Sequence, residues 1–405
     1  MKPETVFNYL FILLLPSVLI SFAANSIIFV LLSVIVAFSQ LTLGYSNAFF
    51  KKYGWFSTFI ISIFIAFLLD IINQHGFNTR LLTKRLAFVL LPFIVFYSKK
   101  SHQTLALKML VYSMSILSSL FIVIGLIRSW LNKGEIVYGN WDSETTETFY
   151  ANDMLLNWGE LSYKRIFLFL DIHPTYYAFF SAVVILIILF TPFIKLGKWQ
   201  KWALVFLHSL MILLISSKAG IISLLLIMGI EFFKAKNPKQ MILGLSVLSL
   251  ITIIALSIPS TQLRIKRAYQ SVVLKDTSVK KSSSVGRLQL WNSLNDFSTT
   301  ELITGLGIKT SRAKVKEFTG QDKNMHNQFL QALVSSGIIG LILLICFLAM
   351  PSFYHKNIFI YSFTALLVVN LFLENMLDRV SGIMMVAFFY SLFIFGDESL
   401  FNKEP

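Results

Sequence analysis

The sequence predicts an all-α fold: a polytopic membrane protein of about twelve transmembrane helices, with a long polar loop that contains short amphipathic helices. Of its 405 residues, 56% are hydrophobic and only 14% are charged, whereas soluble domains carry about 25% charged residues. The apolar residues form long blocks, and runs of about 17–25 apolar residues are long enough to cross a bilayer. The only cysteine, Cys346, lies in such a block, so an internal disulfide and a cysteine-based metal site are both excluded.

Twelve ranges have the composition of membrane spans. In chain order they are 6–23, 27–43, 55–72, 83–98, 105–127, 174–193, 202–217, 219–233, 240–258, 328–350, 358–374 and 383–396. The first follows Met1-Lys2 and also fits a signal peptide, but many spans follow it and we interpret it as a span. Only the letters SSKAG separate the seventh from the eighth, which predicts a tight helical hairpin.

The lysines of the short loops predict the orientation, because cytoplasmic loops carry an excess of Lys and Arg. One set of loops is rich in lysine. The opposite loops at 24–26 and 375–382 contain a single Lys or Arg, which is Arg379. We therefore expect the lysine-rich loops and both termini in the cytoplasm. The loop before the fourth span disagrees, since it places Arg80, Lys84 and Arg85 on the outer side. Either the topology differs there or these cations bind an anionic ligand.

Two polar regions remain on the outer side. Residues 128–165 are acidic in the middle, and residues 259–325 hold twelve Lys or Arg against five Asp or Glu, a balance of about +7. Neither is long enough for an independent domain. The chain thus divides into nine helices over 1–258, a basic loop over 259–327, and the last three helices with a cytoplasmic tail over 328–405.

The basic loop predicts an amphipathic helix that begins near the turn Ser282–Ser284. Apolar residues follow at helical spacing: Leu288, Leu290, Trp291, Leu294 and Phe297. Arg287 lies in the first turn, where a cation opposes the helix dipole. This position favours an anion held by both the guanidinium and the helix N-terminus.

The other cations of the loop allow two interpretations. Most of its lysines fit contact with anionic lipid headgroups, and a second short helix at about 308–319 carries several of them. Arg264, Arg267 and Arg287 bracket the first helix and predict phosphate binding, because guanidinium binds phosphate in a bidentate way. The letters TGLGI supply a turn, but they lack the strand and helix that phosphate loops need. Nucleic acid is a poor partner, because the loop faces away from the cytoplasm.

Polar residues beside the spans are candidate functional groups, because charge at membrane depth is costly. Lys218 either acts at a site or extends its amine toward water, and His173 precedes the sixth span with Asp171 placed to orient it. Asp70 is expected at the edge of a span. Glu374 and Asp378 are four residues apart, on one predicted helix face, and either form part of a site or only pair with Arg379.

His326 and Asn327 stand where the basic loop meets the tenth span. Either His326 is an interfacial residue with a polar tip, or it acts at a site there, with Asn327 helping to start or cap the span. No H-x-x-x-H spacing occurs, so we expect neither a metal nor a cofactor.

An ordered set of motifs over residues 84–385 resembles the O-antigen ligase and O-antigen polymerase family. In order, these are LLPFIVF after KR, HPTYYAFF, ISSKAG, SVGRLQLWNSL, TGLGI, HNQFLQALVSSGIIGL and LENMLDRVSGI. The most specific part is R-x-x-x-W, then G-x-G, then H-N-x-x-L, entering a span after a long outer loop.

The resemblance implies a GT-C-type glycosyltransferase of the bacterial inner membrane with its active site on the periplasmic side. It would move a glycan from undecaprenyl diphosphate to a lipid A–core acceptor, with inversion. The alternative is a polymerase that joins lipid-linked repeat units of an O-antigen or exopolysaccharide. The family pattern implies His326 as the base and Arg287 as a diphosphate ligand, with Trp291 in the same motif. Lys218 replaces a common family arginine and loses its bidentate fork.

A transporter is the competing class, because twelve spans fit it equally well. Transporters place their polar residues near the bilayer midplane, whereas these gather toward one face. A scaffold of an envelope complex has no specific support.

Overall fold

The computed structural model describes residues 3–43, 47–73, 79–132, 136–139, 146–149, 156–161, 163–167, 170, 172–233, 238–258, 261–262, 265–266, 269–270, 273–274 and 283–401. These residues form two compact units. Unit 1 comprises 1–110, 190–195 and 289–405, and unit 2 comprises 111–189 and 196–288.

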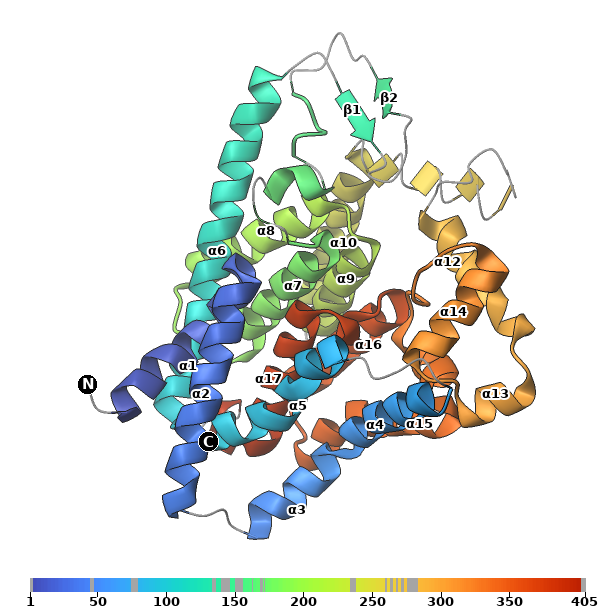
Figure 1. Ribbon diagram of the computed structural model, residues 1–405. Coiled ribbons are helices and arrows are strands. Elements are labelled where there is room, and N and C mark those ends of the chain that lie inside the picture. The colour runs from blue at the N-terminus through green and yellow to red at the C-terminus, as the bar shows by residue number, and fades with distance from the viewer. Residues whose placement is uncertain are drawn as a thin grey trace. The chain divides into compact units, whose positions relative to one another are not determined.

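The helices of unit 1 come from both ends of the chain (Figure 1). The N-terminal ones are α1 (Pro3–Ile20), α2 (Phe22–Leu43), α3 (Asn47–Phe56), α4 (Thr58–Ile72), α5 (Thr79–Tyr97) and the start of α6 (Lys100–Leu131). The C-terminal ones are the end of α12 (Ser283–Asn292), η3 (Ser293–Asp296), α13 (Thr299–Thr304), α14 (Ile308–Thr319), α15 (Gln328–Tyr354), α16 (Ile358–Leu373), η4 (Met376–Asp378), α17 (Val380–Phe395) and η5 (Glu398–Leu400).

Helix α17 is the enclosed helix of unit 1, since every residue from Ser381 to Phe395 is buried. It packs on α5 and α1, while α15 packs on α4 and α16. The ring of Phe347 on α15 stacks on Phe59 of α4 at 4.9 Å and on Tyr390 of α17 at 4.6 Å. Helices from the two ends of the sequence therefore share one core.

Unit 2 holds the rest of α6, the hairpin β1 (Ile136–Gly139) and β2 (Thr146–Phe149), η1 (Tyr163–Phe167), α7 (Pro174–Phe190), α8 (Lys198–Ile215), α9 (Lys218–Phe233) and α10 (Pro238–Ser257). The strands pair antiparallel with Ile136 opposite Phe149. The predicted all-α class missed this hairpin. Helix α7 is enclosed, with Tyr176 to Leu189 buried. The predicted hairpin of α8 and α9 is confirmed, and Ser216 turns it with a left-handed φ of 53°.

A helix overlaps each of the twelve predicted ranges. Among the described residues, α2, α6, α8 and α15 are long and apolar enough to cross a membrane, and five apolar helices are shorter. This is the make-up of a multi-pass membrane protein, and the number of spans stays a prediction. Helix α3 was not predicted, because Lys51, Lys52 and Gly54 interrupt its apolar pattern.

Candidate functional site

The candidate site begins at the N-terminal end of α15. Asn327 caps this helix as predicted: its Oδ1 accepts hydrogen bonds from the backbone N–H groups of Phe329 at 2.9 Å and Leu330 at 3.1 Å. Such a cap satisfies donors that have no partner inside the helix. It fixes the point at which the preceding loop joins α15, and that loop carries His326.

His326 adopts a left-handed backbone conformation with φ of 46°. This conformation is uncommon for a residue with a side chain, and it persists where surrounding contacts impose it. The imidazole Nδ1 lies 2.8 Å from Oε1 of Glu374. The Glu374 side chain is 9% exposed and that of His326 is 31% exposed. A buried carboxylate thus meets an imidazole that still reaches solvent.

The contact defines the chemistry of the imidazole. An ionised carboxylate only accepts hydrogen bonds, so Nδ1 carries the proton and Nε2 keeps a lone pair. A carboxylate in this place also stabilises the positive charge that forms when Nε2 takes up a proton. With a carboxylate behind it, the imidazole is able to accept a proton at Nε2.

The prediction that Glu374 and Asp378 share one helix face is wrong. Helix α16 ends before Glu374, whose backbone is extended, and Asp378 lies in the short 3-10 helix η4. The suggested pairing with Arg379 does not occur for either carboxylate. Glu374 contacts His326, and Asp378 binds Arg85. Arg379 itself is exposed.

Arg85 takes a different place from the one predicted. Its side chain is 8% exposed; Nη2 lies 2.5 Å from Oδ1 of Asp378, and Nε donates to the carbonyl of Leu377 at 3.4 Å. A buried guanidinium with these partners joins α5 to η4. The structure gives no support to Arg85 as a diphosphate ligand. Lys84, its neighbour on α5, is partly exposed.

A buried amide connects the two sides of the histidine–glutamate pair. Oε1 of Gln331 accepts from the backbone N–H of Met325 at 3.2 Å and from Nδ2 of Asn375 at 3.4 Å. Met325 precedes His326, and Asn375 follows Glu374. One turn earlier on α15, Oε1 of Gln328 accepts from the backbone N–H of Leu377 at 3.0 Å. The sequence interpretation did not single out these amides, although polar residues at 328 and 331 interrupt an apolar run.

The end of α12 holds the same loop from its other side. Nε1 of Trp291 donates to the carbonyl of Met325 at 2.9 Å, and its ring meets Phe372 of α16 edge-on. Five buried side chains form a small core below it: Leu290, Phe297, Val315, Met325 and Val334. The predicted amphipathic helix is confirmed, but it ends at Asn292 and continues as η3.

The TGLGI segment docks into a break in α15. Gly337 interrupts that helix with φ of 68°, and the carbonyls of Val334 and Ser335 accept from the N–H groups of Leu306 and Gly307 at 3.0 and 2.9 Å. The backbone of Gly305 comes so close to Gly337 that neither residue has space for a Cβ atom. These glycines therefore serve a close backbone contact with α15, which the predicted turn did not anticipate.

Asp70 is more than a residue at a helix edge. It lies fully buried in the last turn of α4, and its Oδ1 accepts from the N–H groups of Lys309 at 2.8 Å and Thr310 at 3.3 Å. Helix α14 begins after Gly307, which has no side chain to cap it. Asp70 supplies that cap from a distant part of the chain, so α4 holds α14 in place.

The predicted helix at 308–319 is confirmed as α14, and two of its cations have acidic partners. Nζ of Lys314 lies 2.5 Å from Oε1 of Glu301, and Nε of Arg312 lies 2.7 Å from Oδ1 of Asp322. Hydrogen bonds from Lys314 and from the backbone of Ser298 lower the pKa of the Glu301 carboxyl. Both cations are therefore paired within the segment itself.

The remaining predicted site residues belong to unit 2 or fall outside the described residues. Lys218 is the first residue of α9, and His173 precedes α7 with its ring edge-on to Tyr176; both belong to unit 2. Arg287 is on α12, one turn before Trp291. Several predicted residues fall outside the described ones: Asp171, Arg264, Arg267 and the side chain of Arg80. Where residues are described, no group of three His, Cys, Asp or Glu could hold a metal ion.

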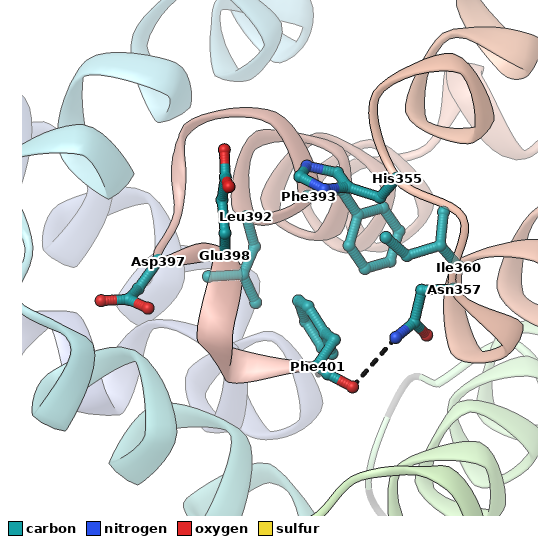
Figure 2. Close-up of a pocket in the computed structure, with 8 residues that line it drawn as sticks. All are labelled: His355, Asn357, Ile360, Leu392, Phe393, Asp397, Glu398 and Phe401. Atoms are coloured by element: carbon teal, nitrogen blue, oxygen red, sulfur yellow. Dashed lines mark hydrogen bonds between the residues drawn. The ribbon is translucent and has the colours of Figure 1, made fainter. Parts of the chain in front are cut away.

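A shallow hollow of about 230 Å³ lies at the opposite end of α15 (Figure 2). His355, Asn357 and Phe401 contribute to its wall, and Nδ2 of Asn357 donates to the carbonyl of Phe401 at 2.9 Å. This hollow is separate from the His326 site, because 27 residues of α15 lie between His326 and His355.

The fold and the site together define a multi-pass membrane protein with a histidine–carboxylate pair at one end of a long apolar helix. Residues 203–345 match the family model described as O-antigen ligase. The predicted resemblance to the O-antigen ligase and polymerase family is thereby confirmed. The match includes Lys218, Arg287 and His326 and ends before Glu374. It supports an enzyme of the ligase and polymerase type that acts on lipid-linked glycans. No curated protein matches the chain.

Proposed function

We propose that the protein is an inverting glycosyltransferase of the GT-C type in the bacterial inner membrane. It transfers a glycan from undecaprenyl diphosphate to a lipid A–core acceptor on the periplasmic side, without a metal. The observation that carries the proposal is the contact of 2.8 Å between Nδ1 of His326 and Glu374, at the place where the polar segment 283–327 enters α15.

In the proposed reaction, Nε2 of His326 removes the proton from an acceptor hydroxyl. The hydroxyl oxygen attacks the anomeric carbon of the donor sugar from the face opposite the diphosphate. A new carbon–oxygen bond forms while the bond to the diphosphate breaks, and the lipid diphosphate leaves with the bonding electrons. Glu374 stabilises the imidazolium, and the proton later passes to water. General base catalysis of this kind contributes roughly 10²–10⁴-fold.

Cations must stabilise the leaving diphosphate, since negative charge develops there in the transition state. We assign this role to Arg287 and Lys218, which the family pattern implies, with Lys84, Arg264 and Arg267 as further candidates. Arg379 is a candidate as well, because it is exposed and lies five residues after Glu374. Arg85 is better assigned to holding η4. His173, Asn327 and Trp291 would support the site.

Deletion of the gene tests the proposal, with gel analysis of the surface polysaccharide. For a ligase, we expect loss of all core-attached glycan and accumulation of lipid-linked chains. Core that bears a single repeat unit would identify the alternative, a polymerase. Unchanged core-attached glycan and unchanged chain length would contradict both.

A further inference from the structure

We infer that Gln331 is a positioning residue, which fixes the geometry between His326 and Glu374. The inference rests on the proposed function, because it assigns Gln331 a role in aligning the proposed base. In this role Gln331 does not touch substrate. It acts through the residues on either side of the pair.

One oxygen atom of Gln331 accepts two hydrogen bonds. A carbonyl oxygen has two lone pairs, and Oε1 of Gln331 uses them for two segments far apart in the sequence. It accepts from the N–H of Met325 at 3.2 Å and from Nδ2 of Asn375 at 3.4 Å. Only one peptide bond separates Met325 from His326, and one separates Asn375 from Glu374. A shift of Gln331 therefore moves both members of the pair.

Gln331 is itself held in place by its surroundings on α15. It lies in the second turn of α15, four residues after the cap Asn327, and is 6% exposed. Asn375 is held by a second acceptor: the same Nδ2 also donates to Oδ2 of Asp378 at 3.2 Å, and Asp378 binds Arg85 at 2.5 Å. A hydrogen-bonded network thus runs from α5 through η4 to α15, with Gln331 at its centre.

The network holds His326 in an uncommon backbone conformation. His326 has a left-handed φ of 46°, a strained conformation that persists only where the surroundings impose it. The N–H of Met325, bound to Gln331, and the carbonyl of Met325, bound to Trp291, fix the peptide groups just before His326. Without the Gln331 bond, this loop would be free to relax and to separate the imidazole from Glu374.

The experiment measures kcat and KM for glycan transfer by the purified full chain, with undecaprenyl-diphosphate-linked glycan as donor. Gln331→Met keeps the volume of the side chain and removes the acceptor. Because a misplacement of about 1 Å can cost 10²-fold in rate, we expect kcat to fall about 10- to 100-fold while KM changes less than about twofold. Unchanged kcat in Gln331→Met would overturn the inference.

Gln328→Met is the matched control, since Gln328 is also buried on α15 and also holds η4, but through Leu377. It should lose a similar amount of stability and much less kcat. Equal loss of kcat in the two variants would make the role of Gln331 merely structural and would overturn the inference.

Asn375→Ala provides a second variant, which tests the same bond from its other end. If both residues act through one network, the double variant Gln331→Met with Asn375→Ala should lose no more kcat than the stronger single variant. Additive losses would contradict the inference. His326→Ala is measured in parallel: if it abolishes transfer while Gln331→Met does not, only the inference fails. Transfer that persists in His326→Ala refutes the proposed function and the inference with it.

Discussion

At the scale of single residues, Glu374 gives His326 its chemical character. The carboxylate accepts a hydrogen bond from Nδ1–H and leaves Nε2 as the basic nitrogen, 2.8 Å being a normal length for a charge-assisted bond. An exposed histidine without this partner would populate both tautomers and several rotamers. The pair supports the proposal that His326 is a general base, and the variants below test it against the alternative of an interfacial histidine.

Replacement of the carboxylate tests this assignment. Glu374→Gln keeps the size of the side chain, but its amide group can donate to Nδ1 and so favour the wrong tautomer. We expect kcat for glycan transfer to fall roughly 10²- to 10⁴-fold. The exposed Glu317 on α14 provides the control, because Glu317→Gln should transfer at the wild-type rate. Wild-type kcat in Glu374→Gln would contradict the role of the carboxylate.

The short helices α13 and α14 contain a second carboxylate with a testable property. Glu301 caps α13 together with Ser298 and binds Lys314, and these bonds hold its pKa below the ordinary value of 4.5. A lowered folded-state pKa means that the stabilisation is present above about pH 4.5. It is lost as the pH falls through the folded-state value.

We therefore expect Glu301→Gln to lower the melting temperature at pH 7, with a difference from wild type that shrinks as the pH falls below 4.5. Thermal unfolding of the detergent-solubilised protein measures this. A difference that stays constant from pH 7 to pH 3 would mean that the ion pair adds no pH-dependent stability.

At the scale of elements, the break in α15 joins the loop helices to the membrane helices. At the break, the carbonyls of Val334 and Ser335 accept hydrogen bonds from the backbone N–H groups of the TGLGI segment. On the α4 side, Asp70 caps α14 and Asn73 donates to the carbonyl of Leu306 at 2.9 Å. The loop helices are thus fixed by backbone contacts that a side chain on either glycine would prevent.

Gly337→Ala should therefore destabilise the protein more than strain alone explains. Gly320 is the matched control, because it has the same φ of 68° and no atom within 4 Å of an added Cβ. For Gly320→Ala we expect a loss of about 1–2 kcal/mol in the free energy of unfolding, from the left-handed conformation alone. Gly337→Ala should exceed this loss and also reduce transfer. Equal losses, measured by thermal unfolding, would show that the docking contact contributes nothing.

At the scale of the whole molecule, the sequence predicted the membrane class, a helix in each of the twelve apolar ranges and the hairpin at residues 216–217. These follow from long apolar runs and from glycine and serine turns, which are local signals. The enclosure of α17 and α7 could not be predicted, because a helix that is apolar on all sides looks the same against lipid and against other helices.

The site was predictable only in part, for a related reason. The family motif pointed to His326, and the position before the apolar run pointed to the Asn327 cap. The remaining contacts join distant residues. His326 and Glu374 are 48 positions apart, and Arg85 and Asp378 are 293 apart. Asp70 is about 240 positions from its partners on α14. Local spacing suggested Arg379 as the partner of Glu374 and Asp378. In the structure these carboxylates instead contact His326 and Arg85, which are distant in sequence.

The most direct test of the account is transfer by His326→Ala, purified and reconstituted with undecaprenyl-diphosphate-linked glycan and an acceptor. His355→Ala is the control, since His355 lies at the other end of α15 beside the hollow of Figure 2. We predict that His326→Ala retains its fold and loses at least about 10²-fold in kcat, while His355→Ala transfers at the wild-type rate. Transfer by folded His326→Ala at the wild-type rate would contradict the account.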